Sequence, residues 1–207
     1  RKMLEDLNLR VSAITFPTRR GFHVVDQLEQ RIEATKQAMQ MAFRLGASVV
    51  VNQIGNVPDS TDDPAWDVLR GSMAELSQYG QHVGALFAAR TGTESSDDLL
   101  RLFDALPHSS IAVDFDPGNL IVNGFSASES VRALASNILH VHATDAVRDL
   151  AIGRGIRVPL GQGSADYPEL LGVLEEQQYR GYFTIEREGA EDPISEIAAA
   201  VNYLKNL

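Results

Sequence analysis

Three residues whose side chains bind metals and carry protons follow short apolar segments in this sequence: Asp116, His142 and Glu186. Carboxylate oxygens and imidazole nitrogens are common ligands of hard and borderline divalent cations. A cation held by three protein ligands keeps open positions for substrate oxygens, where it polarises a carbonyl or neutralises an enediolate as it forms. The three residues therefore predict a divalent metal site for proton transfer, provided that the segments end at one place.

Each residue near this predicted site also has a structural explanation when it is taken alone. An Asp before Pro117-Gly118 is more often a turn former than a ligand, and the strand is expected to break there. Asp114 shares a strand face with Asp116 but lies deeper, and it needs a partner because an unpaired buried charge is costly. His140 is interpreted as a packed or hydrogen-bonded core histidine outside the site. Only the joint occurrence of acids and imidazole at successive strand ends favours the metal hypothesis.

Strands and helices alternate six times along the chain, and each strand is a short, largely apolar run. The predicted strands are 9–16, 48–52, 83–90, 111–116, 138–142 and 182–185. The predicted helices are 24–45, closed by Gly46, 65–79, closed by Gly80, 99–106, and three more beginning at Ser126, Asp166 and Asp192. Such alternation implies a parallel α/β sheet with right-handed crossovers.

Two folds fit this alternation, an open doubly wound sheet and a closed (β/α)8 barrel. The nucleotide-binding glycine pattern of the open fold is missing, because Gly161-Gln-Gly163 is too short and no glycine-rich turn follows the first strand. Polar residues at the ends of four successive strands favour the barrel, whose chemistry lies on that face. These four residues are Arg90, Asp116, His142 and Glu186.

The chain is short for a complete barrel. A barrel usually has eight strands and about 250 residues, whereas the 207 residues here hold six strand–helix units. We therefore expect a single, partial TIM-barrel domain over residues 1–207, with about two units missing ahead of Arg1. A barrel open by two strands exposes sheet edges and apolar surface, which predicts a homodimer or a longer natural chain.

Composition narrows the class of partner. The net charge is −10 and the basic residues cluster only at Arg19-Arg20, which argues against a nucleic-acid partner. No apolar run reaches the ~20 residues of a membrane span. Cysteine is absent, so disulfides and thiolate metal sites are excluded. We expect a cytoplasmic protein that binds a small carbohydrate-like molecule, without a nucleic-acid or membrane partner.

Four stretches of the chain carry a more specific signal. They are Val113–Leu120 (VDFDPGNL), Leu139–Ala146 (LHVHATDA), Pro159–Ser164 (PLGQGS) and Tyr179–Glu188 (YRGYFTIERE). In this order they resemble the sugar phosphate isomerase/epimerase family of the xylose isomerase-like TIM barrels. The resemblance implies that the chain holds the third to eighth strands of the barrel. It also implies a divalent cation (Mn²⁺, Mg²⁺, Co²⁺ or Zn²⁺) bound by Glu, Asp, His and Glu at the ends of strands five to eight.

Carried over residue by residue, the resemblance gives roles to five positions. The metal-binding Asp, His and final Glu correspond to Asp116, His142 and Glu186, and Glu186 is also implied to be the catalytic base. A substrate-binding position three residues after the metal Asp, which is His in several epimerases, is Asn119 here. The Arg six residues after the metal His is Arg148, and it is implied to bind substrate hydroxyls.

The first metal-binding Glu does not carry over, because the corresponding residue is Arg90. A guanidinium stays charged and cannot bind a cation, and its charge would repel one nearby. Arg90 is therefore expected to weaken or abolish metal binding, and it could instead bind substrate or pair with Asp116 and Glu186. Glu94 could substitute as a ligand, but it lies past the strand end and is expected nearer the next helix.

Two functions remain open at this point, and whether the chain is an active enzyme depends on them. The first is a sugar, sugar-phosphate or polyol isomerase or epimerase that uses a divalent metal for proton transfer α to a carbonyl. The alternative is a catalytically degenerate member of the family that binds a sugar-like or anionic ligand without metal, with Arg90 as its cation. The abasic-site endonuclease branch of the fold fits poorly, because it needs a His-rich multi-zinc site and the chain has five His.

Overall fold

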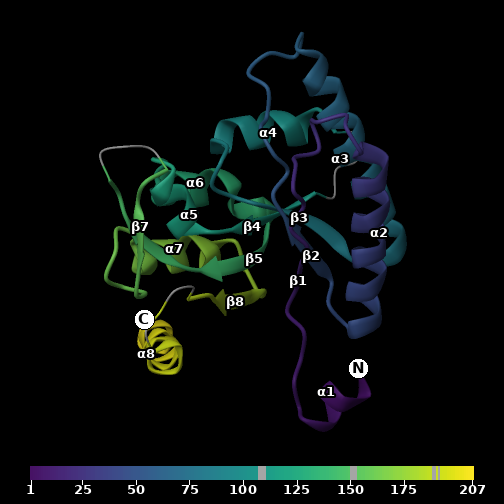
Figure 1. The fold of residues 1–207 in the computed structure, drawn as a ribbon. Helices are drawn as coiled ribbons and strands as arrows, with labels where there is room; N and C mark the ends of the chain where they lie inside the picture. The colour runs from purple at the N-terminus through teal and green to yellow at the C-terminus, as the bar shows by residue number, and fades with distance from the viewer. Residues whose placement is uncertain (107–110, 150–152, 188–189, 191) are drawn as a thin grey trace. The chain divides into compact units, whose positions relative to one another are not determined.

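The structure is a computed structural model that describes residues 1–106, 111–149, 153–187, 190 and 192–207 (Figure 1). Its internal contacts divide the chain into two compact units. The first unit comprises Arg1–Arg90 and Asp97–Val113, and the second comprises Thr91–Ser96 and Asp114–Leu207. The expectation of a single domain stays a prediction, and each unit is described by itself.

The first unit contains the first three strands in chain order. Its elements are α1 (Lys2–Asp6), β1 (Ile14–Thr15), α2 (Leu28–Leu45), β2 (Val49–Asn52), α3 (Pro64–Val83), β3 (Leu86–Arg90) and most of α4 (Ser96–Asp104). Strand β2 pairs in parallel with β1 and with β3. Helices α2 and α3 pack against each other and against β2 and β3 (Figure 1). All four residues of β2 are buried, as expected for a strand that is covered on both faces.

Two glycines explain where the helices of this unit end. Gly46 has φ of +87° and closes α2, which confirms the predicted left-handed cap. The prediction that Gly80 ends the next helix is wrong. Gly80 lies inside α3, where a Cβ would come within 2.8 Å of the Met39 side chain, and Gly84 with φ of +84° ends the helix instead. Gly80 is therefore explained by close packing.

The second unit carries the candidate site. It contains the end of β4 (Ala112–Phe115), then α5 (Pro117–Val122), α6 (Ala127–Leu134), the 3₁₀ turn η1 (Ala135–Asn137), β5 (Ile138–Ala143), β6 (Asp145–Val147), β7 (Ile156–Val158), α7 (Tyr167–Glu176), β8 (Tyr182–Ile185) and α8 (Pro193–Lys205). The sheet strands follow the order β4-β5-β8, and β5 pairs with β8 in parallel so that His142 lies beside Thr184. Strands β6 and β7 form a separate antiparallel pair, which the sequence did not predict.

Helix N-caps in this unit follow the sequence closely. Ser126, Asp166 and Asp192 each accept a hydrogen bond from the backbone N–H three residues on, as predicted, at 3.1–3.2 Å. The same geometry occurs at Asp116, which accepts from the N–H of Asn119 at 2.8 Å and begins α5. The break after the strand is confirmed, but it opens a helix that the sequence reading missed.

The alternation of parallel strands and helices is thus confirmed, whereas some bounds differ. The first strand has two residues rather than the eight of 9–16, and β3 begins at Leu86 rather than Val83. Within the described residues, no helix combines the length and the apolar character needed to span a bilayer.

Candidate metal and substrate site

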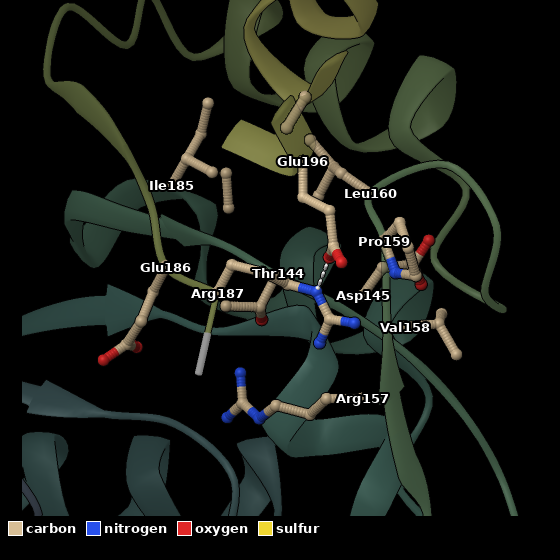
Figure 2. Close-up of a pocket in the computed structure, with 12 residues that line it drawn as sticks. Thr144, Asp145, Arg157, Val158, Pro159, Leu160, Ile185, Glu186, Arg187 and Glu196 are labelled. Atoms are coloured by element: carbon tan, nitrogen blue, oxygen red, sulfur yellow. Dashed lines mark hydrogen bonds and ion pairs between the residues drawn. The ribbon is translucent and has the colours of Figure 1, made fainter. Parts of the chain in front are cut away.

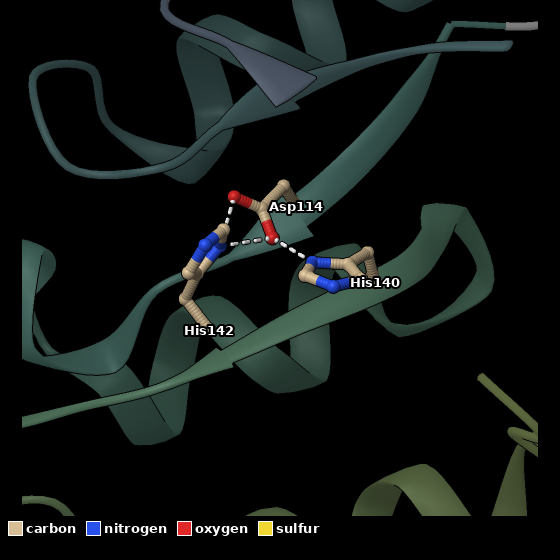
Figure 3. A group of neighbouring side chains, drawn as sticks. All are labelled: Asp114, His140 and His142. Carbon is tan, nitrogen blue, oxygen red and sulfur yellow. Dashed lines mark hydrogen bonds and ion pairs between the residues drawn. The ribbon is translucent and has the colours of Figure 1, made fainter. Parts of the chain in front are cut away.

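In the second unit, a buried carboxylate lies between two imidazoles (Figure 3). Asp114 Oδ1 lies 2.7 Å from Nδ1 of His140, and Asp114 Oδ2 lies 2.7 Å from Nδ1 of His142. The other ring nitrogen of His140 lies 2.8 Å from the hydroxyl of Thr184 on β8. The expectations that Asp114 needs a partner and that His140 is hydrogen-bonded are both confirmed.

The charge state of this cluster follows from its contacts. Burial raises the pKa of Asp114, but hydrogen bonds from His140 and His142 outweigh it and hold the pKa below its ordinary value. The carboxylate is therefore ionised at neutral pH and can only accept, so both Nδ1 atoms carry the donated protons. Each imidazole is thereby fixed in orientation by the same acid.

The cluster could hold a divalent cation. One ligand atom from each of Asp114, His140 and His142 lies within 4.8 Å of the others, and all three residues are buried. Two imidazoles and a carboxylate form a donor set that suits Zn²⁺, Mn²⁺ and similar borderline ions. A carboxylate that orients a metal-binding histidine through its other nitrogen is also a common arrangement. His142 belongs both to this cluster and to the set predicted from sequence.

Asp116, the second predicted ligand, makes different contacts. Its Oδ1 accepts from the N–H of Asn119 and from the hydroxyl of Thr144, and its Oδ2 lies 3.3 Å from Nη2 of Arg157 on β7. Its own N–H donates to the hydroxyl of Thr91 at 2.9 Å. The carboxylate is fully buried and is engaged on both oxygens. A cation bound here would have to replace the guanidinium.

Asn119, the predicted substrate contact, already makes hydrogen bonds within the protein. Its side-chain Nδ2 donates to the carbonyl of Thr91 at 2.8 Å, and its backbone N–H donates to Asp116. The chain after Thr91 passes so close that a Cβ on Gly92 would lie 2.0 Å from Asn119 Nδ2. Asn119 therefore fixes the segment that leads to Glu94, a residue that is itself 4% exposed in the second unit.

Glu186, the predicted base, lines a pocket in the second unit (Figure 2). The lining includes Thr144, Asp145, Arg157, Glu186, Arg187 and Glu196. Glu186 directly follows β8, as predicted for a residue at a strand end. Arg157 lines this pocket and also contacts Asp116, so it connects two of the predicted site residues.

The remaining predicted residues are placed as follows. Arg148 follows β6 and is exposed, and it is not among the lining residues of this pocket. Arg90 is the half-buried last residue of β3 in the first unit, so its approach to Asp116 and Glu186 stays a prediction. Glu188, in the last resembling stretch, lies outside the described residues.

Sequence reasoning missed Arg157 and Asp145. Both belong to the β6–β7 pair, whose short strands contain charged residues and lack a regular apolar pattern. Asp145 accepts four backbone N–H groups, from Ala146 and Ala165 on Oδ1 and from Gly161 and Gly163 on Oδ2, at 2.8–3.0 Å. Gly163 of the PLGQGS stretch was the available signal, because a Cβ there would lie 2.1 Å from Asp145 Oδ1.

Comparison with known proteins places the chain in a family. The model of the xylose isomerase-like TIM barrel matches residues 1–207. The chain belongs to the xylose isomerase-like TIM barrel family. The predicted fold class is thereby confirmed, with six strands of the sheet in the described residues where a full barrel has eight.

Individual solved structures and sequence relatives are also similar to this chain. A xylose isomerase domain protein from Planctomyces limnophilus superimposes with a TM-score of 0.90 at 25% identity, over 99% of this chain and 80% of that one. A Mycobacterium smegmatis member, solved in complex with magnesium, gives 0.80 at 19% identity over 99% and 75%. Among sequence relatives, inosose dehydratase from Bacillus thuringiensis (strain Al Hakam) is 22% identical over 223 residues, which cover 93% of this chain and 73% of the relative.

Proposed function

We propose that this protein moves a proton at the carbon next to the carbonyl of a sugar, sugar phosphate or polyol-derived ketone, as an isomerase or epimerase. The observation that carries the proposal is the position of Glu186 in a pocket of the unit that also contains the Asp114–His140–His142 cluster. A carboxylate base and a possible cation site in the same unit suit removal of a proton α to a carbonyl. The likeness to a xylose isomerase domain protein and to inosose dehydratases supports a sugar-like carbonyl substrate.

Glu186 is the residue that takes the proton in this proposal. Its carboxylate accepts the proton from the α carbon, and the bonding electrons move to the carbonyl oxygen to give an enediolate. Return of a proton to the neighbouring carbon gives isomerisation, whereas return to the same carbon from the opposite face gives epimerisation.

The donor atoms present fit a divalent cation, and His142 is its central ligand in our proposal. Asp114 and His140 complete the described cluster, while Asp116 and Glu186 complete the alternative set. A bound Mn²⁺, Mg²⁺, Co²⁺ or Zn²⁺ would polarise the substrate carbonyl and stabilise the enediolate. Asp114 belongs only to the first set and Asp116 only to the second, so the metal content of Asp114→Asn and of Asp116→Asn separates the two sets.

The second candidate is a protein that binds a sugar-like or anionic ligand without turnover. The contacts of Asp116 favour it, because Arg157 takes the place beside Oδ2 that a cation would need. Arg90 also favours this candidate, because it replaces a metal-binding Glu and a guanidinium cannot bind a cation. Under this candidate, added Mn²⁺ or Mg²⁺ leaves the melting temperature unchanged, and Arg90→Glu creates metal binding. Metal binding by the unaltered protein would contradict it.

The proposed reaction is tested by proton exchange with solvent. The protein is incubated in D₂O with ketoses, aldoses and inososes, each with and without Mn²⁺, and ¹H NMR follows the signal of the proton next to the carbonyl. We expect loss of that signal for at least one compound, with product appearing in parallel. Absence of exchange across the panel, together with measurable ligand binding, would favour the second candidate.

A further inference from the structure

Two arginines from different elements line the pocket that contains Glu186. Arg157 lies on β7 and Arg187 directly follows Glu186 after the end of β8. Their side chains are 31% and 18% exposed, so both are partly shielded from water. The site predicted from sequence used neither arginine.

Each guanidinium is anchored at one side by a carboxylate. Nη2 of Arg157 lies 3.3 Å from Oδ2 of Asp116, and Nε of Arg187 donates to Oε2 of Glu196 on α8. A guanidinium carries five N–H donors, so one anchoring bond leaves several available. Figure 2 shows the terminal nitrogens of Arg187 turned away from Glu196, on the side where Arg157 lies. In the described part of the chain, the Nη atoms of Arg187 have no further acceptor.

The other acids of the pocket are already engaged. Asp145 accepts four backbone N–H groups, and Glu196 is paired with Arg187. The backbone N–H dipoles therefore compensate the charge of Asp145, and the Arg187 guanidinium compensates the charge of Glu196. The N–H groups that remain on the two arginines are rigidly presented, because each side chain is held by its own ion pair. Fixed guanidinium forks of this kind match the planar or tetrahedral oxygens of an anion.

We propose that Arg157 and Arg187 together bind an oxyanion of the substrate, either a carboxylate or a phosphate. The ligand is then a sugar acid or a sugar phosphate rather than a neutral sugar. The inference rests on the proposed function in one respect only, namely that the reacting carbon of the substrate lies beside Glu186. Binding of the anion itself requires no turnover.

The test is binding of matched anionic and neutral ligands by calorimetry at constant ionic strength. D-glucuronate, D-glucose 6-phosphate and inorganic phosphate represent the two oxyanions, and D-glucose is the neutral comparison. We expect at least one anionic sugar to bind about tenfold or more tightly than glucose, since hydrogen bonds to charged groups dominate such contacts. Whichever of glucuronate and glucose 6-phosphate binds more tightly identifies the oxyanion.

Variants assign the binding to these two residues. Arg187→Gln and Arg157→Gln should each lower the affinity for the anionic sugar about tenfold and leave the affinity for glucose unchanged. Arg187→Lys should recover part of the lost affinity. Arg154→Gln is the control, because Arg154 is exposed nearby and does not line the pocket. Far-UV circular dichroism verifies that each variant folds.

Equal binding of anionic and neutral sugars, absence of anion binding, or unchanged binding in Arg187→Gln would each overturn the proposal. Failure of the proposed function has a different signature. In that case anion binding depends on both arginines as predicted, but no compound exchanges its α proton in D₂O.

Discussion

Replacement of Asp145 by Asn should loosen the loop that borders the pocket. Asp145 is 2% exposed and its two oxygens accept four backbone N–H groups, two from the loop glycines Gly161 and Gly163 and two from Ala146 and Ala165. An Asn side chain offers a single acceptor oxygen. Its amide nitrogen would face two backbone donors and leave them without an acceptor.

The magnitude follows from these lost bonds. A hydrogen bond to a charged group contributes about 1.5–3 kcal/mol, and a buried donor left unsatisfied costs about 1–3 kcal/mol. Two lost bonds, with weakening of the other two, give a destabilisation of about 3–5 kcal/mol. For a chain of this length, that corresponds to a fall in Tm of about 10 °C or more.

Urea denaturation followed by circular dichroism measures the free energy of unfolding. Asp104→Asn is the matched control, because Asp104 ends α4 on the exposed surface and should change stability by less than about 0.5 kcal/mol. Trypsin supplies a local readout, since cleavage after Arg157 should become faster when the loop opens. A loss of less than about 1 kcal/mol in Asp145→Asn, with unchanged cleavage, would refute the role assigned to this carboxylate.

Three further predictions concern neighbouring contacts. Arg157→Gln removes the cation beside Asp116 Oδ2 and should strengthen Mn²⁺ binding about tenfold in calorimetry; equal affinity in this variant and in Arg154→Gln would contradict the competition. Burial, with the charges of Asp145 and Asp116, raises the pKa of Tyr167 well above its usual value. The phenol therefore ionises first in the unfolded state, and stability present at neutral pH is lost as pH rises past the ordinary tyrosine range. Tyr167→Phe should reduce that alkaline loss in urea titrations, at a cost of about 1 kcal/mol at neutral pH from its bond to the Thr144 carbonyl; an identical alkaline profile would count against it. Gly163→Ala should destabilise by more than about 2 kcal/mol, because a Cβ would lie 2.1 Å from Asp145 Oδ1. Gly172→Ala on α7, where a Cβ meets nothing within 4 Å, should be neutral or stabilising, and similar thermal shifts for both glycine variants would be inconsistent with the packing.

Sequence alone predicts the parts of the fold that local chemistry determines. The buried strand β2 is a continuous apolar run, and the caps at Ser126, Asp166 and Asp192 are local patterns of a side chain and the N–H three residues on. The β6–β7 pair has no such pattern. Its position depends on Asp145 binding backbone groups up to 20 residues later, which a local pattern does not reveal.

The candidate site shows the same limit. Alternation along a strand correctly placed Asp114 with Asp116, and His140 with His142, on shared faces. It could not give the register between neighbouring strands. In the structure Asp114 contacts His142, while Asp116 meets Thr144, two residues further along. These contacts test neither the predicted homodimer nor the predicted cytoplasmic location, and both stay predictions.

The most direct measurement of the central claim is the rate of α-proton exchange with and without the Glu186 carboxylate. Glu186→Gln keeps the size of the side chain but removes its basicity, whereas Glu176→Gln alters an exposed residue at the end of α7. With a compound that the unaltered protein exchanges in D₂O, we expect Glu186→Gln to slow exchange about 10²- to 10⁴-fold and Glu176→Gln to leave it unchanged. Equal exchange rates for the two variants would contradict Glu186 as the base.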